Sequence, residues 1–151
     1  MADVLWGTFA AWADVVSAAS LNALANASSV VSGDIDNTTA RDQYAEVSFR
    51  TVTSTMAVVA GGHLAIYILP RSHDDTTFPN GATSGTTLPG ASYLRGIIGF
   101  PAGTISPTGS VIVPIVARVI RIGMVNRLGV AFAAHASNMQ LRYSTGSEAV
   151  V

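Results

Sequence analysis

Short runs of alternating apolar and polar residues fill most of the chain from residue 43 onward. Residues 43–52 set Tyr44, Val47 and Phe49 among polar neighbours, and such near-alternation predicts a half-buried strand. Residues 63–69 are apolar on both faces, which predicts a strand covered on both sides. We predict further strands at residues 27–33, 92–100, 110–122, 128–132 and 139–143.

Glycine and proline separate these runs, and the chain shows neither alternation of strands with helices nor a repeat of fixed period. Six to eight strands with short connections fit an all-β fold, an antiparallel jelly-roll-like β-sandwich. Pro114 lacks a backbone N–H for the ladder, so the strand at 110–122 must lie at an edge or contain a bulge there.

The N-terminal residues follow a different pattern. Trp6, Phe9, Trp12 and Val16 recur at three- and four-residue spacing, as one face of a helix would. Gly7 interrupts such a helix, and an extended arm that lays the same rings on a neighbour is the alternative. Further along, a short helix is predicted from Ser20, its capping residue, through Ala25.

The chain therefore divides into three parts within a single domain. Residues 1–27 form an N-terminal arm with a short helix, residues 28–144 form the β-sandwich, and residues 145–151 form a C-terminal tail that we expect to fray. Residues 70–90 are a long polar stretch inside the sandwich, and a connection of that length is usually a functional or binding loop.

Charge is scarce. Eight basic and nine acidic residues give a net charge of −1, and charged residues are 11% of the chain, against about 25% in ordinary domains. We therefore expect a partner to cover part of the surface, with a homo-oligomer as the first candidate. Direct nucleic-acid binding is excluded for want of positive charge. The charge-free stretches 51–70 and 96–117 are broken by polar residues or prolines, so we expect no membrane partner.

All eight basic residues are arginine. Arginine is enriched and lysine depleted in interface cores, because the planar guanidinium is weakly hydrated and binds carboxylates in a bidentate manner. A GC-rich genome would give the same bias. Cysteine is absent, which excludes disulfides and thiolate chemistry.

No residue constellation specific to catalysis is present, so we expect a protein that is not an enzyme and has no cofactor. His73, Asp74 and Asp75 form a compact group of potential metal ligands, but adjacent residues in a polar loop are usually solvated, and we predict no metal site. Asp34 and Asp36 could do acid–base work as a carboxylate pair, cap turns, or pair with arginine across a subunit boundary.

The order of several short segments resembles the small jelly-roll structural proteins of tailed-bacteriophage virions, among them capsid decoration or cement proteins. The segments that carry this resemblance are residues 20–26, 44–49, 64–70, 78–81, 92–98, 129–132 and 139–143. The resemblance implies a virion protein on the capsid surface that binds the major capsid protein, bridges neighbouring subunits and self-associates.

If the resemblance is correct, part of the surface contacts neighbouring subunits, and several residues are candidates for that interface. Trp6, Phe9 and Trp12 are aromatic anchors for docking or arm exchange, unless they fill the core of the domain itself. Four arginines are candidates for pairs with Asp34, Asp36, Asp74 or Asp75 of a neighbouring subunit, namely Arg50, Arg71, Arg95 and Arg142.

Two other functions remain open at this point. One is a component of the phage tail, baseplate or fibre attachment, which would also be rich in β-strands and oligomeric. The other is a carbohydrate-binding jelly roll in which Tyr67, Phe78 or Tyr93 stacks on sugar rings near the 70–90 loop.

Overall fold

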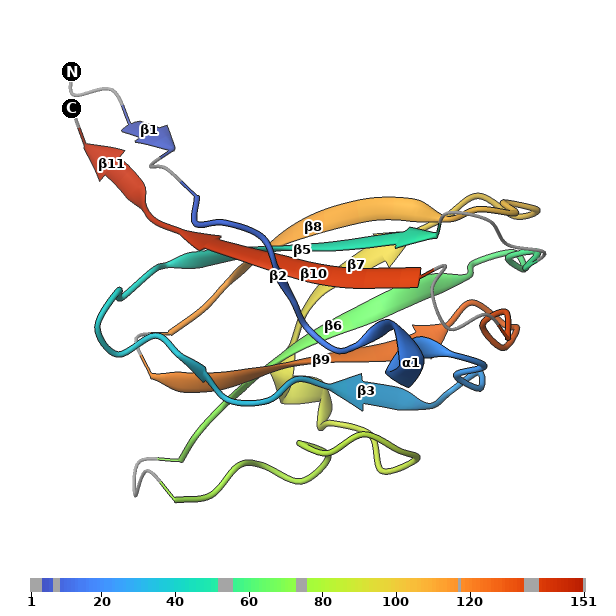
Figure 1. Cartoon of the computed structure of the whole chain (residues 1–151), viewed down its shortest axis with the longest axis horizontal. Helices are drawn as coiled ribbons and strands as arrows, with labels where there is room; N and C mark the ends of the chain where they lie inside the picture. The colour runs from blue at the N-terminus through green and yellow to red at the C-terminus, as the bar shows by residue number, and fades with distance from the viewer. Residues whose placement is uncertain are drawn as a thin grey trace.

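The computed structural model describes residues 4–6, 9–51, 56–72, 76–116, 118–134 and 139–150, with backbone alone at 4–6 and 148–150. Figure 1 shows the arrangement of its elements. The strands are β1 (Val4–Trp6), β2 (Ala13–Asp14), β3 (Ser29–Val31), β4 (Ile35–Asp36), β5 (Tyr44–Thr51), β6 (His63–Pro70), β7 (Leu94–Gly99), β8 (Thr108–Pro114), β9 (Val119–Arg127), β10 (Met139–Gly146) and β11 (Glu148–Val150). The helices are α1 (Ala18–Leu21) and the 3₁₀ helix η1 (Ala91–Tyr93).

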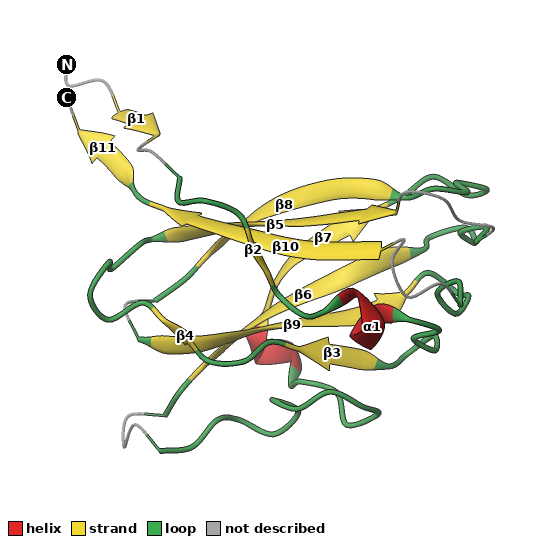
Figure 2. Ribbon diagram, in the orientation of Figure 1, coloured by secondary structure: helices red, strands yellow, loops and turns green. Residues whose placement is uncertain are grey.

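Two antiparallel sheets pack face to face, as Figure 2 shows. One has the strand order β2-β10-β5-β8, and the other has the order β3-β9-β6-β7, with β4 also paired to β9. With β3 and β4 counted as one broken strand, the pairing is nested: β2 with β10, β3 and β4 with β9, β5 with β8, and β6 with β7. This is the folded-back long hairpin of a jelly roll, and the predicted all-β sandwich is confirmed.

The main core lies between the two sheets. β5 alternates between buried and more exposed positions along its whole length, as its sequence pattern predicts. Its Phe49 ring is fully buried and lies 5.3 Å from the ring of Phe132 and 6.5 Å from that of Phe100, measured between centroids. Aromatic rings at these spacings add to the stability gained by burying apolar surface.

A second hydrophobic cluster lies on the outer face of the other sheet. The buried members of this cluster include Ala65, Tyr67 and Leu69 of β6, together with Ala82 of the 71–90 segment. Phe78 and Leu88 of the same segment pack against the cluster. The predicted coverage of β6 on both faces is therefore confirmed, and the long polar stretch proves to be a cover over the sheet (Figure 2).

Two strand predictions are wrong. Residues 110–122 are divided between β8 and β9, which lie in different sheets, and the chain leaves the ladder directly after Pro114. Residues 128–132 form a turn rather than a strand. The buried side chain of Asn126 organises this turn, because it accepts a hydrogen bond from the Leu128 N–H and donates to the carbonyl of Val130.

The N-terminal segment is extended rather than helical over residues 9–14. The Ala10 N–H donates to the Thr145 carbonyl, so the arm follows β10. The short helix begins earlier than predicted, because Ser17 rather than Ser20 caps it. Neither helix that the structure describes is long and apolar enough to span a membrane.

The structure places strands in the part of the chain expected to form a C-terminal tail. β10 continues past the predicted end at residue 143 to Gly146, and β11 follows after one residue. β11 pairs with β1 in a separate two-stranded ribbon, with Val4 opposite Val150. Figure 1 shows this ribbon projecting from one corner of the sandwich.

Candidate functional site

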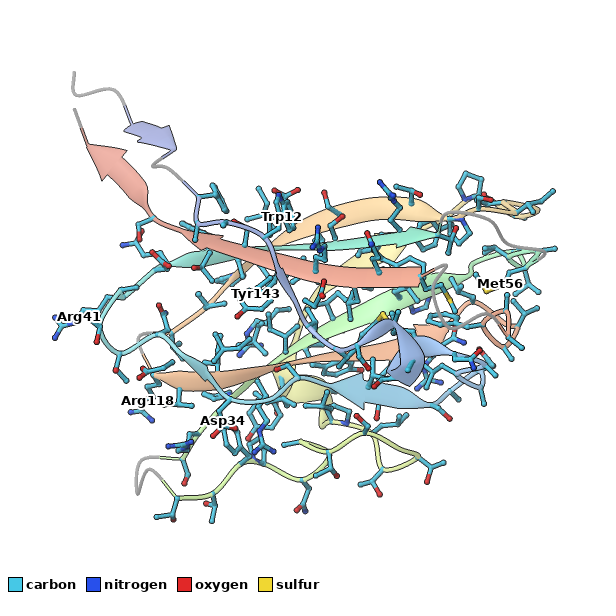
Figure 3. All side chains as sticks on the ribbon, in the orientation of Figure 1. Trp12, Asp34, Arg41, Met56, Arg118 and Tyr143 are labelled. Atoms are coloured by element: carbon cyan, nitrogen blue, oxygen red, sulfur yellow. The ribbon has the colours of Figure 1, made fainter. Side chains whose placement is uncertain are left out.

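Three of the predicted interface residues meet on the outer face of the β2-β10-β5-β8 sheet. Trp12, Arg50 and Arg142 line a hollow of about 180 Å³, which Ser48 and Gln140 complete. The strand register explains the grouping, because Arg50 lies opposite Gln140 and Arg142 lies opposite Ser48 on the paired strands β5 and β10. The Trp12 side chain stands over this face (Figure 3) and remains 43% exposed.

The hollow carries unbalanced positive charge. Arg142 donates from Nε to Oδ1 of Asp14 at 2.9 Å, so that guanidinium has a partner within the chain. Within the part of the chain that the structure describes, the side chain of Arg50 has no ion pair or hydrogen bond. Since the two arginines are diagonal neighbours on adjacent strands, the hollow suits a carboxylate or another anionic group.

Arg71 lies elsewhere, in a cluster that anchors the 71–90 segment. Asp34 accepts hydrogen bonds from Arg71 and from Nε of Arg121, the latter at 2.8 Å. Both guanidinium groups lie over the Phe78 ring, at 5.3 Å for Arg71 and 4.0 Å for Arg121. Arg71 thus pairs with Asp34 within one chain.

The charge environment of Asp34 follows from these contacts. The hydrogen bond from Arg121, with a further one from Arg71, holds the pKa of the Asp34 carboxyl below its ordinary value of 3.8. Arg121 also donates from Nη1 to the Ala82 carbonyl at 2.9 Å, which ties β9 directly to the covering segment. The contacts of Asp34 and Arg121 therefore hold the covering segment against the sheet.

Two other predicted residues have local structural roles. Asp36 accepts hydrogen bonds from the hydroxyl and the backbone N–H of Thr38, and these contacts lower the pKa of its carboxyl. Of the roles considered for Asp36, the structure shows the turn cap. Arg95 donates from Nη1 to the carbonyls of Ser92 and Leu94, beside η1.

The remaining predicted residues divide into two groups. The Phe9 ring lies on the backbone of Gly146, where a Cβ would come within 3.1 Å of the ring. The side chain of Trp6 and all of residues 73–75, the predicted metal-ligand group, lie outside the described residues.

The carbohydrate alternative loses one of its three aromatic rings to the core. Tyr67 is 8% exposed within the second hydrophobic cluster. The Phe78 ring already lies beneath two guanidinium groups. Tyr93 and Phe78 both line a shallow hollow of about 290 Å³ beside Arg71 and Arg118.

Sequence reasoning missed a second surface, at the end of the sandwich where four connections meet. These connections are residues 22–28, 56–62, 100–107 and 128–134. They are hydrogen-bonded to one another: the N–H of Val59 donates to the carbonyl of Leu128, and that of Phe132 donates to the carbonyl of Leu24. None of the four contains Asp, Glu, Lys or Arg. We call this surface the uncharged end.

Apolar side chains of the uncharged end face solvent. Ile105 is 58% exposed and Val59 is 44% exposed, in company with several exposed alanines. The opposite end carries Asp34, Arg41 and Arg118, as Figure 3 shows. The sequence holds a signal for this surface, because the charge-free stretches 51–70 and 96–117 contain two of the four connections.

Comparison with known proteins adds no family assignment. No protein-family model matches the sequence, and a search of curated proteins finds no similar sequence.

Proposed function

We propose that this protein is a non-enzymatic structural component of a tailed-bacteriophage virion, a cement or decoration protein that binds the major capsid protein on the capsid surface. The observation that carries the proposal is the uncharged end, where exposed Ile105 and Val59 lie among connections that contain no charged residue.

A surface of this composition suits a protein contact. The cores of protein interfaces are depleted in charged residues, because a charge that loses water without gaining a partner is costly. The uncharged end would dock on the shell, while the opposite end, with Asp34, Arg41 and Arg118, would face solvent.

The fold supports the proposal without determining it. The jelly roll recurs in viral capsid proteins, but also in lectins and cupins. Function therefore has to rest on the surfaces. A protein that binds only the assembled shell stabilises that shell by mass action, and this chemistry requires no catalytic group.

The decisive measurement is quantitative mass spectrometry of purified virions from the source, reported as copies of this chain per major capsid subunit. A ratio near unity, or a simple fraction of it, supports the proposal. A few copies per particle would indicate a tail component, and absence from virions would overturn the virion assignment. Heads that lack the protein should also release their genome at a lower temperature.

A further inference from the structure

We propose that the outer face of the β2-β10-β5-β8 sheet binds the same face of a second copy of this chain. In this contact, Glu46 of each copy enters the hollow formed by Trp12, Arg50 and Arg142 of the other. The proposal names the surface through which the proposed assembly protein self-associates, and to that extent it rests on the proposed function.

The charges of this face are complementary to themselves. Asp14 and Glu46 are its acidic residues, and Arg50 and Arg142 are its basic ones. Asp14 and Arg142 pair with each other within the chain. The side chain of Glu46, like that of Arg50, has no ion pair or hydrogen bond among the described residues, so each copy offers one free carboxylate and one free guanidinium.

The two free charges lie on one strand, with Ser48 midway between them. Residues two apart on a strand face the same side at about 6.6 Å, so Glu46 and Arg50 are about 13 Å apart. Consider a two-fold axis that lies above Ser48, parallel to the sheet and perpendicular to β5. This axis brings the two faces together and sets β5 antiparallel to β5 of the second copy. Arg50 of each copy then lies opposite Glu46 of the other, which gives two identical ion pairs.

The shape of the face agrees with this arrangement. The hollow lies on the Arg50 side of Ser48, and its lining of two guanidinium groups and an indole suits an incoming carboxylate. Ile112 of β8 lies opposite Glu46 in the register and is 45% exposed. With Trp12, it supplies apolar surface that a second copy would remove from water. Arg142 is neutralised by Asp14, so it brings no free charge to the axis.

The test is a charge swap on the purified chain. Sedimentation velocity over a concentration series measures the dimer dissociation constant of the wild type, Arg50→Glu, Glu46→Arg and the double variant. Each single reversal places like charges opposite each other and should weaken association at least about tenfold. The double variant restores both pairs and should return to within about threefold of the wild type.

Arg41→Glu is the matched control, because it makes the same change in net charge on an exposed residue between β4 and β5. It should leave the dissociation constant unchanged. A monomeric wild type throughout the series, equal weakening by Arg41→Glu and Arg50→Glu, or failure of the double variant to recover would each overturn the proposal. This experiment needs no virions, so its failure and the failure of the capsid proposal are distinguishable.

Discussion

At the scale of single residues, Asp34 has an importance that its sequence position does not indicate. Its carboxylate joins Arg71, at the start of the covering segment, to Arg121 on β9. An exposed ion pair ordinarily contributes little stability. Here two such pairs share one carboxylate, and both guanidinium groups lie over the Phe78 ring. Together they hold a segment that buries a hydrophobic cluster.

Asp34→Asn should loosen residues 76–90 while the sandwich stays folded. We expect a loss of about 1 kcal/mol in unfolding free energy, the scale of exposed ion pairs, and faster proteolysis within this segment. Because the folded-state pKa of Asp34 is lowered, its contribution is complete above its ordinary value of 3.8 and is lost as the pH falls through the folded-state pKa. The difference between wild type and variant should therefore vanish only in strong acid.

Asp14→Asn is the control for this variant, since it removes the single and more exposed pair with Arg142. Urea unfolding with mass-spectrometric mapping of the cleavage sites measures both effects. Equal protection of residues 76–90 in Asp34→Asn and the wild type would contradict the role assigned to Asp34.

Gly81 has a backbone constraint within the same segment. Its φ is +82°, and an added Cβ would lie 2.5 Å from backbone atoms of Leu88 and Pro89. Gly81→Ala should therefore lower the free energy of unfolding by about 1–3 kcal/mol, the usual cost of a strained left-handed backbone position. Gly103→Ala provides the comparison, because Gly103 has φ +79° with open space around the Cβ position. Chemical denaturation should show the larger loss for Gly81→Ala, and equal losses would exclude the steric clash.

At the scale of elements, local patterns predict strands well where one strand alternates by itself. β5 and β6 follow from their own residues. The division of residues 110–122 does not, because β8 and β9 belong to different sheets and only the assembled fold separates them. The apolar stretch 128–132 also resembles a strand locally, yet a side chain outside the stretch holds it in a turn.

That side chain, Asn126, is fully buried. It donates to the carbonyls of Leu24 and Val130 and accepts from the N–H of Leu128. Asn126→Ala would leave these two carbonyls and this N–H without a partner. It should lower the free energy of unfolding by about 3 kcal/mol. Asn26→Ala removes one exposed hydrogen bond to the N–H of Gly129 and should cost far less. Thermal unfolding followed by circular dichroism compares the stability of the two variants. A similar loss of stability in both would contradict the role of Asn126.

At the scale of the whole molecule, the candidate surfaces depend on the topology. The sequence names Trp12, Arg50 and Arg142 separately, but only the pairing of β5 with β10 brings them to one hollow. The uncharged end likewise gathers four connections from across the chain. Composition predicts that some surface is covered, and it cannot say which, because the position of a connection is set by long-range strand pairing.

The uncharged end yields a prediction at this scale. Ile105→Glu places a charge on a side chain that is 58% exposed, so folding should be nearly unaffected, within about 0.5 kcal/mol. Binding to capsids that lack the protein should fall at least about tenfold, because the contact would bury an unpaired carboxylate. Thr39→Glu adds the same charge at the opposite end and should bind normally. Cosedimentation with capsids measures both, and unimpaired binding of Ile105→Glu would exclude this end as the docking surface.

The ribbon of β1 and β11 has a consequence for how the chain folds. Val4 pairs with Val150, so two strands from opposite ends of the sequence must find each other before either gains a partner. The nested pairs of the jelly roll make a similar demand, with β2 beside β10. Such a high contact order slows folding, because the entropy of closing a long loop is lost before native contacts compensate for it. A circular permutant that joins the two ends and opens within residues 102–106 would turn the ribbon into a local hairpin and shorten that search.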